Sequence, residues 1–443
     1  MKHFAAFAFV FLAWLAPAQA VDLGRMYDAA ALVPWQQNYV GFVRQQLAPI
    51  YEQLTPDERA RIPRLNVDVP VHGTLRAPFE FRSQIADGVR IDMAASAIKF
   101  LGDTMTAATW IGRNGYDLRP LNDYLGLLKY EPVSPPGGRL PDPQSALGVP
   151  RGAGEDPALQ RDVGALLTSA LRFALLHEIG HAVTNSDPAA TGDLARAQDI
   201  RADAFALDVM RRLGAMPNGI ALMLWVQGQL QPHALDLADA PKWTDALALF
   251  RRPITAARAA TLAATLSRDA PGFAARQADP AAAAAVVNAT AQQLAAFANT
   301  LDSRDHQAMN RRIGNTARWT LLQPVKAGEL IAVPDGLAAG NGPNNFHGAF
   351  DGAVRVGDQT TAVRILLWRT GDDVIGVAAN ALYMTHLTGR ASGNSLRFTY
   401  EAFDLRGAGT LQMDAGADTL TGAYGDGTAA SGSGTIAARR RKP

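Results

Sequence analysis

The sequence predicts an α+β fold: a mostly helical domain that contains a small sheet, followed by a C-terminal antiparallel all-β barrel or sandwich. Three observations predict it. Apolar residues recur at helical spacing through most of residues 21–330. A short alternating stretch over residues 79–93 is typical of a hairpin within that part. After residue 346 the pattern changes to short alternating runs separated by turn residues, as in antiparallel β domains.

The first twenty residues have the pattern of a signal peptide. Lys2 precedes an apolar run over residues 4–16, and residues 18–20 read A-Q-A, a typical cleavage site. The apolar run is too short to span a bilayer, and no later run reaches about 18 uninterrupted apolar residues. We therefore expect an exported chain, periplasmic or extracellular in a bacterium, with no transmembrane segment after cleavage.

The composition limits which metal ligands and which binding partners the chain can have. The chain has no cysteine, which excludes disulfides, thiolate zinc sites and a cysteine nucleophile, so a metal must be held by His, Asp or Glu. Lys and Arg number 42 and Asp and Glu 41, and removing Lys2 with the signal leaves 41 of each. This balance gives no electrostatic reason to expect nucleic acid or an anionic membrane as partner.

The one basic run, residues 439–442, is expected to be a solvated chain end. The oligomeric state is unknown from the sequence.

The first half of the first domain (residues 21–330) is predicted to be mainly helical. Helical spacing covers residues 26–51 and 94–110, with extended chain expected over residues 56–64. Residues 79–83 and 88–93 alternate as two strands of a hairpin. Pro and Gly are frequent over residues 131–158, which predicts a long irregular connection, either a surface linker or a lid.

Two successive helices are expected next. Asp156 followed by Pro157 is a typical helix start, and that helix should continue to about Thr184. A second helix is predicted over residues 193–212. Alanine-rich helical pattern then continues over residues 219–322.

A separate antiparallel β domain is predicted over residues 346–440. Turn sequences such as Thr370-Gly371-Asp372 and Ser392-Gly393-Asn394 separate its alternating runs. The runs cover residues 362–368, 374–388, 396–403, 409–413 and 419–424.

The segment HEIGH, residues 177–181, has the residue types and spacing of a metal site. Side chains four residues apart on a helix share a face, so His177 and His181 can present two imidazole nitrogens to one ion, about 2 Å from each. Glu178 points to the side, where its carboxylate can take a proton from a metal-bound water. The pattern predicts one Zn²⁺ ion and hydrolysis by an activated water.

Zinc in a catalytic site needs a third protein ligand and leaves one position for water. Asp199 is the main candidate, because Asp203 lies four residues later on the same helical face. One carboxylate can then bind the metal while the other accepts the free ring N–H of a histidine. Asp187, ten residues after His177, is the alternative third ligand, at the position used by a family that has a tight turn after the helix. That turn usually depends on a glycine, and this chain has Thr184 there.

HEIGH followed by D-I-R-A-D at residues 199–203 resembles the gluzincin class of zinc metallopeptidases. The similarity is to the bacterial and mitochondrial membrane-quality-control peptidases related to CAAX prenyl endopeptidase, whose second motif reads E-x-x-A-D. A looser similarity is to uncharacterised exported bacterial metallopeptidases. The resemblance covers about residues 168–262 and implies a zincin-like domain, with Asp199 as the third ligand and Asp203 as the second acid. The transmembrane helices of that family have no counterpart here.

Two departures from the family pattern concern residues of the expected site. Asp199 replaces the family's glutamate, so the shorter side chain must bring its helix closer or bind the metal less well. The family often has a downstream motif H-P-x-x-x-x-R. Here Arg252-Pro253 and Arg258 resemble this motif, with Arg252 in place of the histidine. The resemblance implies that Arg258 neutralises charge on a substrate oxygen, with an ordinary surface arginine as the alternative.

The predicted function is an exported zinc metalloendopeptidase that hydrolyses peptides or proteins, with Glu178 as general base. The resemblance implies that an extended substrate adds to a sheet edge, and residues 79–83 or 89–93 could supply that edge, with ordinary core strands as the alternative. One alternative is an inactive zincin scaffold, and another is a binding protein whose C-terminal β domain recognises an envelope ligand. The other histidines considered are expected to be structural or surface residues: His233, His306, His347 and His386.

Overall fold

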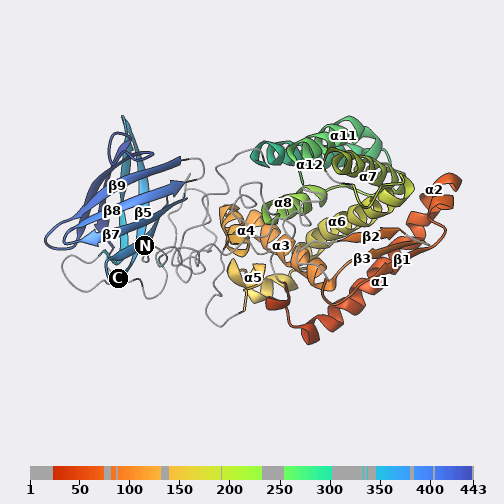
Figure 1. Ribbon diagram of the computed structural model, residues 1–443, viewed down its shortest axis with the longest axis horizontal. Coiled ribbons are helices and arrows are strands. Elements are labelled where there is room, and N and C mark those ends of the chain that lie inside the picture. Colours follow the sequence, from red (N-terminus) through yellow and green to blue (C-terminus); the bar gives the residue numbers. More distant parts are fainter. Residues whose placement is uncertain are drawn as a thin grey trace, which may run out of the picture.

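The structure, a computed structural model, describes residues 23–73, 81–85, 88–130, 139–190, 192–231, 254–301, 333, 337, 346–379, 384–402 and 405–441. Helices pack around a three-stranded sheet in the first part, and a closed antiparallel barrel forms the C-terminal part (Figure 1). The predicted α+β class is confirmed, and the β domain is a barrel rather than a sandwich. The expected signal peptide lies outside the described residues.

Helices make up most of the described first part. They are α1 (Ala29–Gln53), α2 (Pro56–Arg61), α3 (Ala95–Arg113), α4 (Arg119–Tyr130), α5 (Pro143–Ala146), α6 (Pro157–Val183), α7 (Gly192–Leu213), α8 (Ile220–Leu230), α11 (Ala256–Ala274) and α12 (Pro280–Leu301). The predicted helices over 26–51, 94–110, 157–184 and 193–212 are confirmed as α1, α3, α6 and α7.

Two expectations for irregular chain are corrected. The extended stretch expected over residues 56–64 contains α2, because Thr55 and Glu58 form a capping box in which each side chain bonds the other's backbone N–H. Within residues 131–158, the described part contains α5 and a short 3₁₀ helix at Arg151–Glu155. Residues 131–138 of that connection lie outside the described residues.

The sheet contains β1 (Leu65–Asp68), β2 (Arg82–Ile85) and β3 (Val89–Asp92) in the order β1-β3-β2. The predicted hairpin is confirmed, since β2 and β3 pair antiparallel, while β1 joins β3 in parallel. Because β3 is paired on both sides, it cannot offer a free edge to an extended ligand. Of the two stretches considered for that role, only the one containing β2 remains.

Local signals set the limits of α6. The side chain of Asp156 accepts a hydrogen bond from the backbone N–H of Ala158, and Pro157 begins the helix. The helix ends at Val183, and the chain then turns through Asn185, whose φ of 52° lies in the left-handed region.

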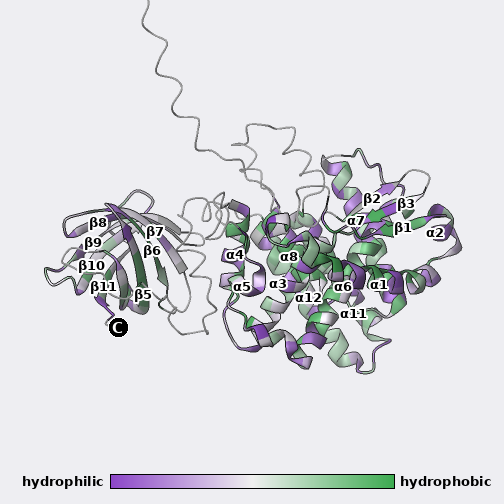
Figure 2. Cartoon of the chain, turned by 90° about the horizontal axis from the view of Figure 1, so that it is seen from below, coloured by the Kyte–Doolittle hydropathy of each residue, from purple (hydrophilic) through white to green (hydrophobic). Residues whose placement is uncertain are grey.

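The hydrophobic core lies around the second half of α6. From Ser169 to Val183 almost every side chain of this helix is buried, among residues of α1, α3, α7, α8 and α11. Figure 2 shows apolar residues concentrated where α3, α6 and α8 meet. By length and composition, α6 and α12 could each cross a membrane, but 61% of the apolar window of α6 is buried inside the protein, as in a core helix.

The barrel has eight strands connected in chain order. They are β4 (Gly348–Val356), β5 (Gln359–Thr370), β6 (Asp373–Ala379), β7 (Met384–Ser392), β8 (Ser395–Ala402), β9 (Leu405–Met413), β10 (Thr419–Asp426) and β11 (Gly434–Arg440). Each strand pairs antiparallel with the next, and β11 pairs with β4 to close the barrel. Residues 374–388, expected as one run, divide into β6 and β7. Alternate side chains such as Phe350, Ile365 and Phe398 fill the interior.

The basic chain end is part of the barrel. Arg440 lies in β11, donates hydrogen bonds to the carbonyls of His347 (2.6 Å) and Ala417 (2.7 Å), and covers the ring of Phe350. The expectation of a solvated end is therefore wrong for Arg440, whose guanidinium packs on the buried ring of Phe350, whereas Arg439 and Arg441 are exposed. His347 and His386 belong to this barrel, whereas His233 and His306 lie outside the described residues.

Candidate metal centre

The two histidines of HEIGH point their rings at one position. His177 and His181 lie one helical turn apart on α6, and their Nε2 atoms are 3.0 Å from each other. The rings are nearly perpendicular, at 86°, with centroids 4.6 Å apart. Their relative exposures are 8% and 0%. With Glu178 they form a buried group of potential ligand atoms that lie within 4.8 Å of one another, and this group could bind a metal ion.

Helix α7 brings a carboxylate to the same position. Asp199 Oδ1 lies 3.4 Å from His181 Nε2 and 3.9 Å from His177 Nε2, and the Asp199 side chain is 1% exposed. Burial favours the neutral acid, but hydrogen bonding with His181 and the charge of Arg258 outweigh it and lower the pKa of Asp199 below its usual value. Asp199 therefore faces the histidine nitrogens as an anion.

The second acid of α7 lies behind the histidines. Asp203 Oδ1 is 2.7 Å from Nδ1 of His177, the ring nitrogen opposite the shared position. An ionised carboxylate there requires Nδ1 to carry the proton, which leaves Nε2 with a free lone pair. The contact thus selects the histidine tautomer that a metal needs.

Arg258 of α11 contacts Asp203. Its Nε and Nη2 lie 2.7 Å from the two oxygens of Asp203, and its Nη1 is 4.0 Å from Asp199. The side chain is buried, so the alternative of an ordinary surface arginine is wrong. Both near contacts are with a protein carboxylate, which makes Arg258 an anchor for the acid that orients His177. Arg252 and Pro253 lie outside the described residues.

Glu178 is held by the edge strand of the sheet. Its Oε2 accepts hydrogen bonds from the backbone N–H of Ser83 at 2.9 Å and from the Ser83 hydroxyl at 2.7 Å. The carboxylate is on the side of α6 that contacts β2, and it is 7% exposed. Ser83 was not among the predicted site residues.

The turn after α6 fixes the second histidine. Nδ1 of His181 lies 3.1 Å from the hydroxyl of Ser186, which lies 3.2 Å from the hydroxyl of Thr184. Thr184 in turn donates to the carbonyl of Gly180. Ser186 therefore has the same place beside His181 that Asp203 has beside His177. Ser186 was not among the predicted site residues either, because it lies beyond the end of α6, where helical spacing no longer indicates which side chains meet.

Asp187 is directed elsewhere. It is exposed, and its Oδ1 accepts a hydrogen bond from the backbone N–H of Ala189 at 2.8 Å. In the described part of the chain, the carboxylates within 4.0 Å of the ring nitrogens of His177 and His181 are those of Asp199 and Asp203. The geometry favours Asp199 over Asp187 as a third ligand.

The helix that carries Asp199 packs unusually close to α6. A Cβ at Gly180 would lie 3.0 Å from both the Cα and the carbonyl oxygen of Ala202. Glycine at 180 therefore allows the backbones of α6 and α7 to approach within a distance that a side chain would prevent. This close approach holds the face of α7 that carries Asp199 against the histidines of α6.

Among the described residues, the charges of this cluster do not cancel. Glu178, Asp199 and Asp203 are three carboxylates around two histidines, and Arg258 is the guanidinium that pairs with them. With neutral imidazoles the sum is about −2, a charge that burial disfavours unless a cation compensates it. Nitrogen and oxygen donors with a net charge of about −2 fit a divalent metal such as zinc.

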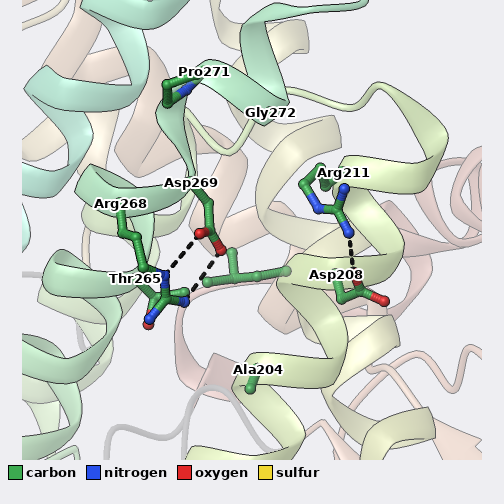
Figure 3. A pocket seen from close by; sticks show the side chains of 9 residues that line it. Ala204, Asp208, Arg211, Thr265, Arg268, Asp269, Pro271 and Gly272 are labelled. Carbon is green, nitrogen blue, oxygen red and sulfur yellow. Dashed lines mark hydrogen bonds and ion pairs between the residues drawn. The ribbon is translucent and has the colours of Figure 1, made fainter.

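A pocket of about 450 Å³ lies between α7 and α11 and is separate from this centre (Figure 3). Its charged lining residues pair along their own helices, Asp208 with Arg211 and Arg268 with Asp269. None of the histidines or acids of the metal centre lines it.

Residues 135–214 match the model of the family Peptidase U49. The matched stretch contains α5, α6 and α7, and so includes the whole histidine cluster and both acids of α7. No curated protein and no solved structure matches the chain. The segment that builds the metal centre is therefore similar to a peptidase family.

The close packing at Gly180 predicts a loss of metal affinity on substitution. In Gly180→Ala the new Cβ would force α7 away from α6, and Asp199 would move away from the histidines. We expect about tenfold weaker binding of zinc, measured by competition with a chromogenic chelator. Gly164→Ala is the matched control, because nothing lies within 4 Å of a Cβ at this exposed position of α6. Equal affinities in the two variants would contradict the argument.

The contacts of Asp203 predict an acid-dependent part of the stability. Burial favours its neutral form, but Arg258 and His177 lower its pKa to about 2 from 3.8. A lowered pKa contributes stability that is present above the unfolded value and is lost as the pH falls through the folded value. We expect the metal-free protein to lose about 2 kcal/mol of unfolding free energy between pH 5 and pH 2 through this group.

Urea unfolding of the wild type and Asp203→Asn across this range tests the expectation. The difference between the two should shrink as the pH falls, while Asp208→Asn on the same helix, which removes a half-exposed ion pair, should show no comparable trend. A difference that stays constant from pH 5 to pH 2 would show that Asp203 is not held ionised by Arg258.

Proposed function

We propose that the chain is an exported zinc-dependent metalloendopeptidase, with His177, His181 and Asp199 as zinc ligands and Glu178 as general base. The observation that carries this proposal is the convergence of three buried donor atoms from α6 and α7 within 3.0–3.9 Å of one another. The similarity of residues 135–214 to a peptidase family supports the same reaction class. Export rests on the signal-like pattern of residues 1–20.

Zinc bound by these donors would lower the pKa of a bound water to about 7 and polarise the scissile carbonyl. The carboxylate of Glu178 would act as the base for the attacking water, accepting one of its protons as the water oxygen adds to the carbonyl carbon. Glu178 then delivers the proton to the leaving nitrogen as the carbon–nitrogen bond breaks. The products are a carboxylic acid and an amine; the acid's proton passes to the amine, so they leave as a carboxylate and an ammonium, and the base is regenerated.

The surrounding residues keep the ligands in the required protonation state. Asp203, fixed by Arg258, holds the proton of His177 on Nδ1 and so leaves Nε2 for the metal. Ser186 can accept the Nδ1 proton of His181 in the same way.

The substrate would bind as an extended strand along β2. This strand is at an edge of the sheet, and its contact with Glu178 places that edge beside the general base. Backbone hydrogen bonds to an edge strand recognise peptides with little dependence on side chains. Peptide or unfolded protein is therefore the proposed substrate class.

The identity of the third ligand can be tested by metal content. We expect Asp199→Asn to lose most of the stoichiometric zinc, because one of three protein ligands becomes a weak neutral donor. Asp187→Asn, the matched control, should keep one zinc per chain, since that carboxylate bonds Ala189. Elemental analysis after dialysis measures both. Zinc loss in Asp187→Asn with none in Asp199→Asn would reverse the assignment.

The reaction itself can be tested with the Glu178→Gln variant. The purified full chain without residues 1–20 should contain one zinc and cleave a fluorescently labelled unfolded protein. A chelator should abolish the activity and zinc should restore it. Glu178→Gln should keep its zinc and lose activity by about 10²–10⁴-fold, because the amide cannot accept the water's proton.

Asp208→Asn, in the pocket between α7 and α11 and away from the histidines, is the control for that comparison and should cleave as the wild type does. Cleavage by Glu178→Gln at the wild-type rate would rule out this mechanism. A zinc-loaded wild type that cleaves nothing would favour the inactive scaffold.

A further inference from the structure

Ser83 occupies the place where the edge strand meets the general base. It lies in β2, opposite Ile91 of β3, yet its backbone N–H donates to Glu178 on α6. That N–H therefore points away from β3, toward the free edge of the sheet. Its hydroxyl points the same way and bonds the same carboxylate.

The two bonds end on one oxygen. Oε2 of Glu178 accepts the N–H at 2.9 Å and the hydroxyl at 2.7 Å. A glutamate side chain has three rotatable torsions, and burying it in one rotamer costs up to about 2 kcal/mol of conformational entropy. Two donors on Oε2 fix the carboxylate plane and leave Oε1 as the oxygen that can face a metal-bound water.

We infer that Ser83 is a positioning residue for Glu178, an inference that rests on the proposed peptidase function. The hydroxyl is the part of Ser83 that acts during turnover. An added substrate strand needs the outward N–H of the edge strand for its own carbonyl, and this use competes with the bond to Glu178. The hydroxyl belongs to the side chain, so it can stay on the carboxylate when the backbone N–H bonds the substrate.

Comparing two variants, Ser83→Thr and Ser83→Val, tests the role of the hydroxyl directly. The two side chains have nearly the same shape and both suit a strand, but only threonine keeps the hydroxyl. We expect Ser83→Val to lower kcat about ten- to hundredfold, the usual effect of losing a hydrogen bond to a charged group. Its KM should stay within about twofold, since the backbone edge that binds substrate is unchanged. Ser83→Thr should retain most of the wild-type kcat.

Metal content and a double variant separate positioning from a structural effect. Both Ser83 variants should contain one zinc, because Ser83 contacts neither histidine ring. In the Glu178→Asp background, where the shorter carboxylate falls short of Ser83, the valine substitution should lower kcat further by less than twofold. A full additional loss in that background would show that Ser83 acts independently of the base and would overturn the inference.

Failure of the inference can be told apart from failure of the proposed function. If Glu178→Gln is inactive and Ser83→Val matches Ser83→Thr in kcat, the peptidase mechanism holds and the role of Ser83 is wrong. If Glu178→Gln cleaves as the wild type does, the proposed function fails, and the inference fails with it. The labelled unfolded protein described above is the probe in every arm.

Discussion

The packing of α6 against α7 determines where each charged group of the metal centre lies. Gly180 lets the two backbones meet at Ala202, and this contact brings Asp199 and Asp203 to opposite sides of His177. A buried cluster with a surplus of carboxylates would be costly in any other context. The rest of the first domain, from the core around α6 to the anchoring of Arg258 by α11, supports this one helix pair.

Local rules were sufficient to predict this pair of helices from the sequence. Asp156 and Pro157 mark the start of α6, and the spacing of four residues fixes which side chains share a face. The same spacing placed Asp199 and Asp203 on the face of α7 that meets the histidines. Such inferences succeed because they depend on residues within one or two helical turns.

The partners of these residues could not be predicted in the same way. Ser83 is 95 residues from Glu178, and Arg258 is 55 residues from Asp203. The hydrophobic periodicity of a segment does not indicate which distant segment will pack against it. Arg258 illustrates the difference: its position along the chain suggested a contact with substrate, whereas the packing of α11 turns it toward Asp203. For the barrel, alternation predicted strands over residues 362–424, but β4 and β11 lie outside the predicted runs, and their pairing is what closes the sheet.

That pairing of β4 with β11 has a consequence for protein engineering. Phe350, near the start of the barrel, lies directly opposite Arg440, near its end, so the chain enters and leaves at adjacent points of one seam. A module whose two ends are neighbours can be joined end to end by a short linker and reopened at another hairpin, or inserted into a surface loop of a host protein. The fold of this barrel is thus compatible with circular permutation and with grafting as a compact cassette.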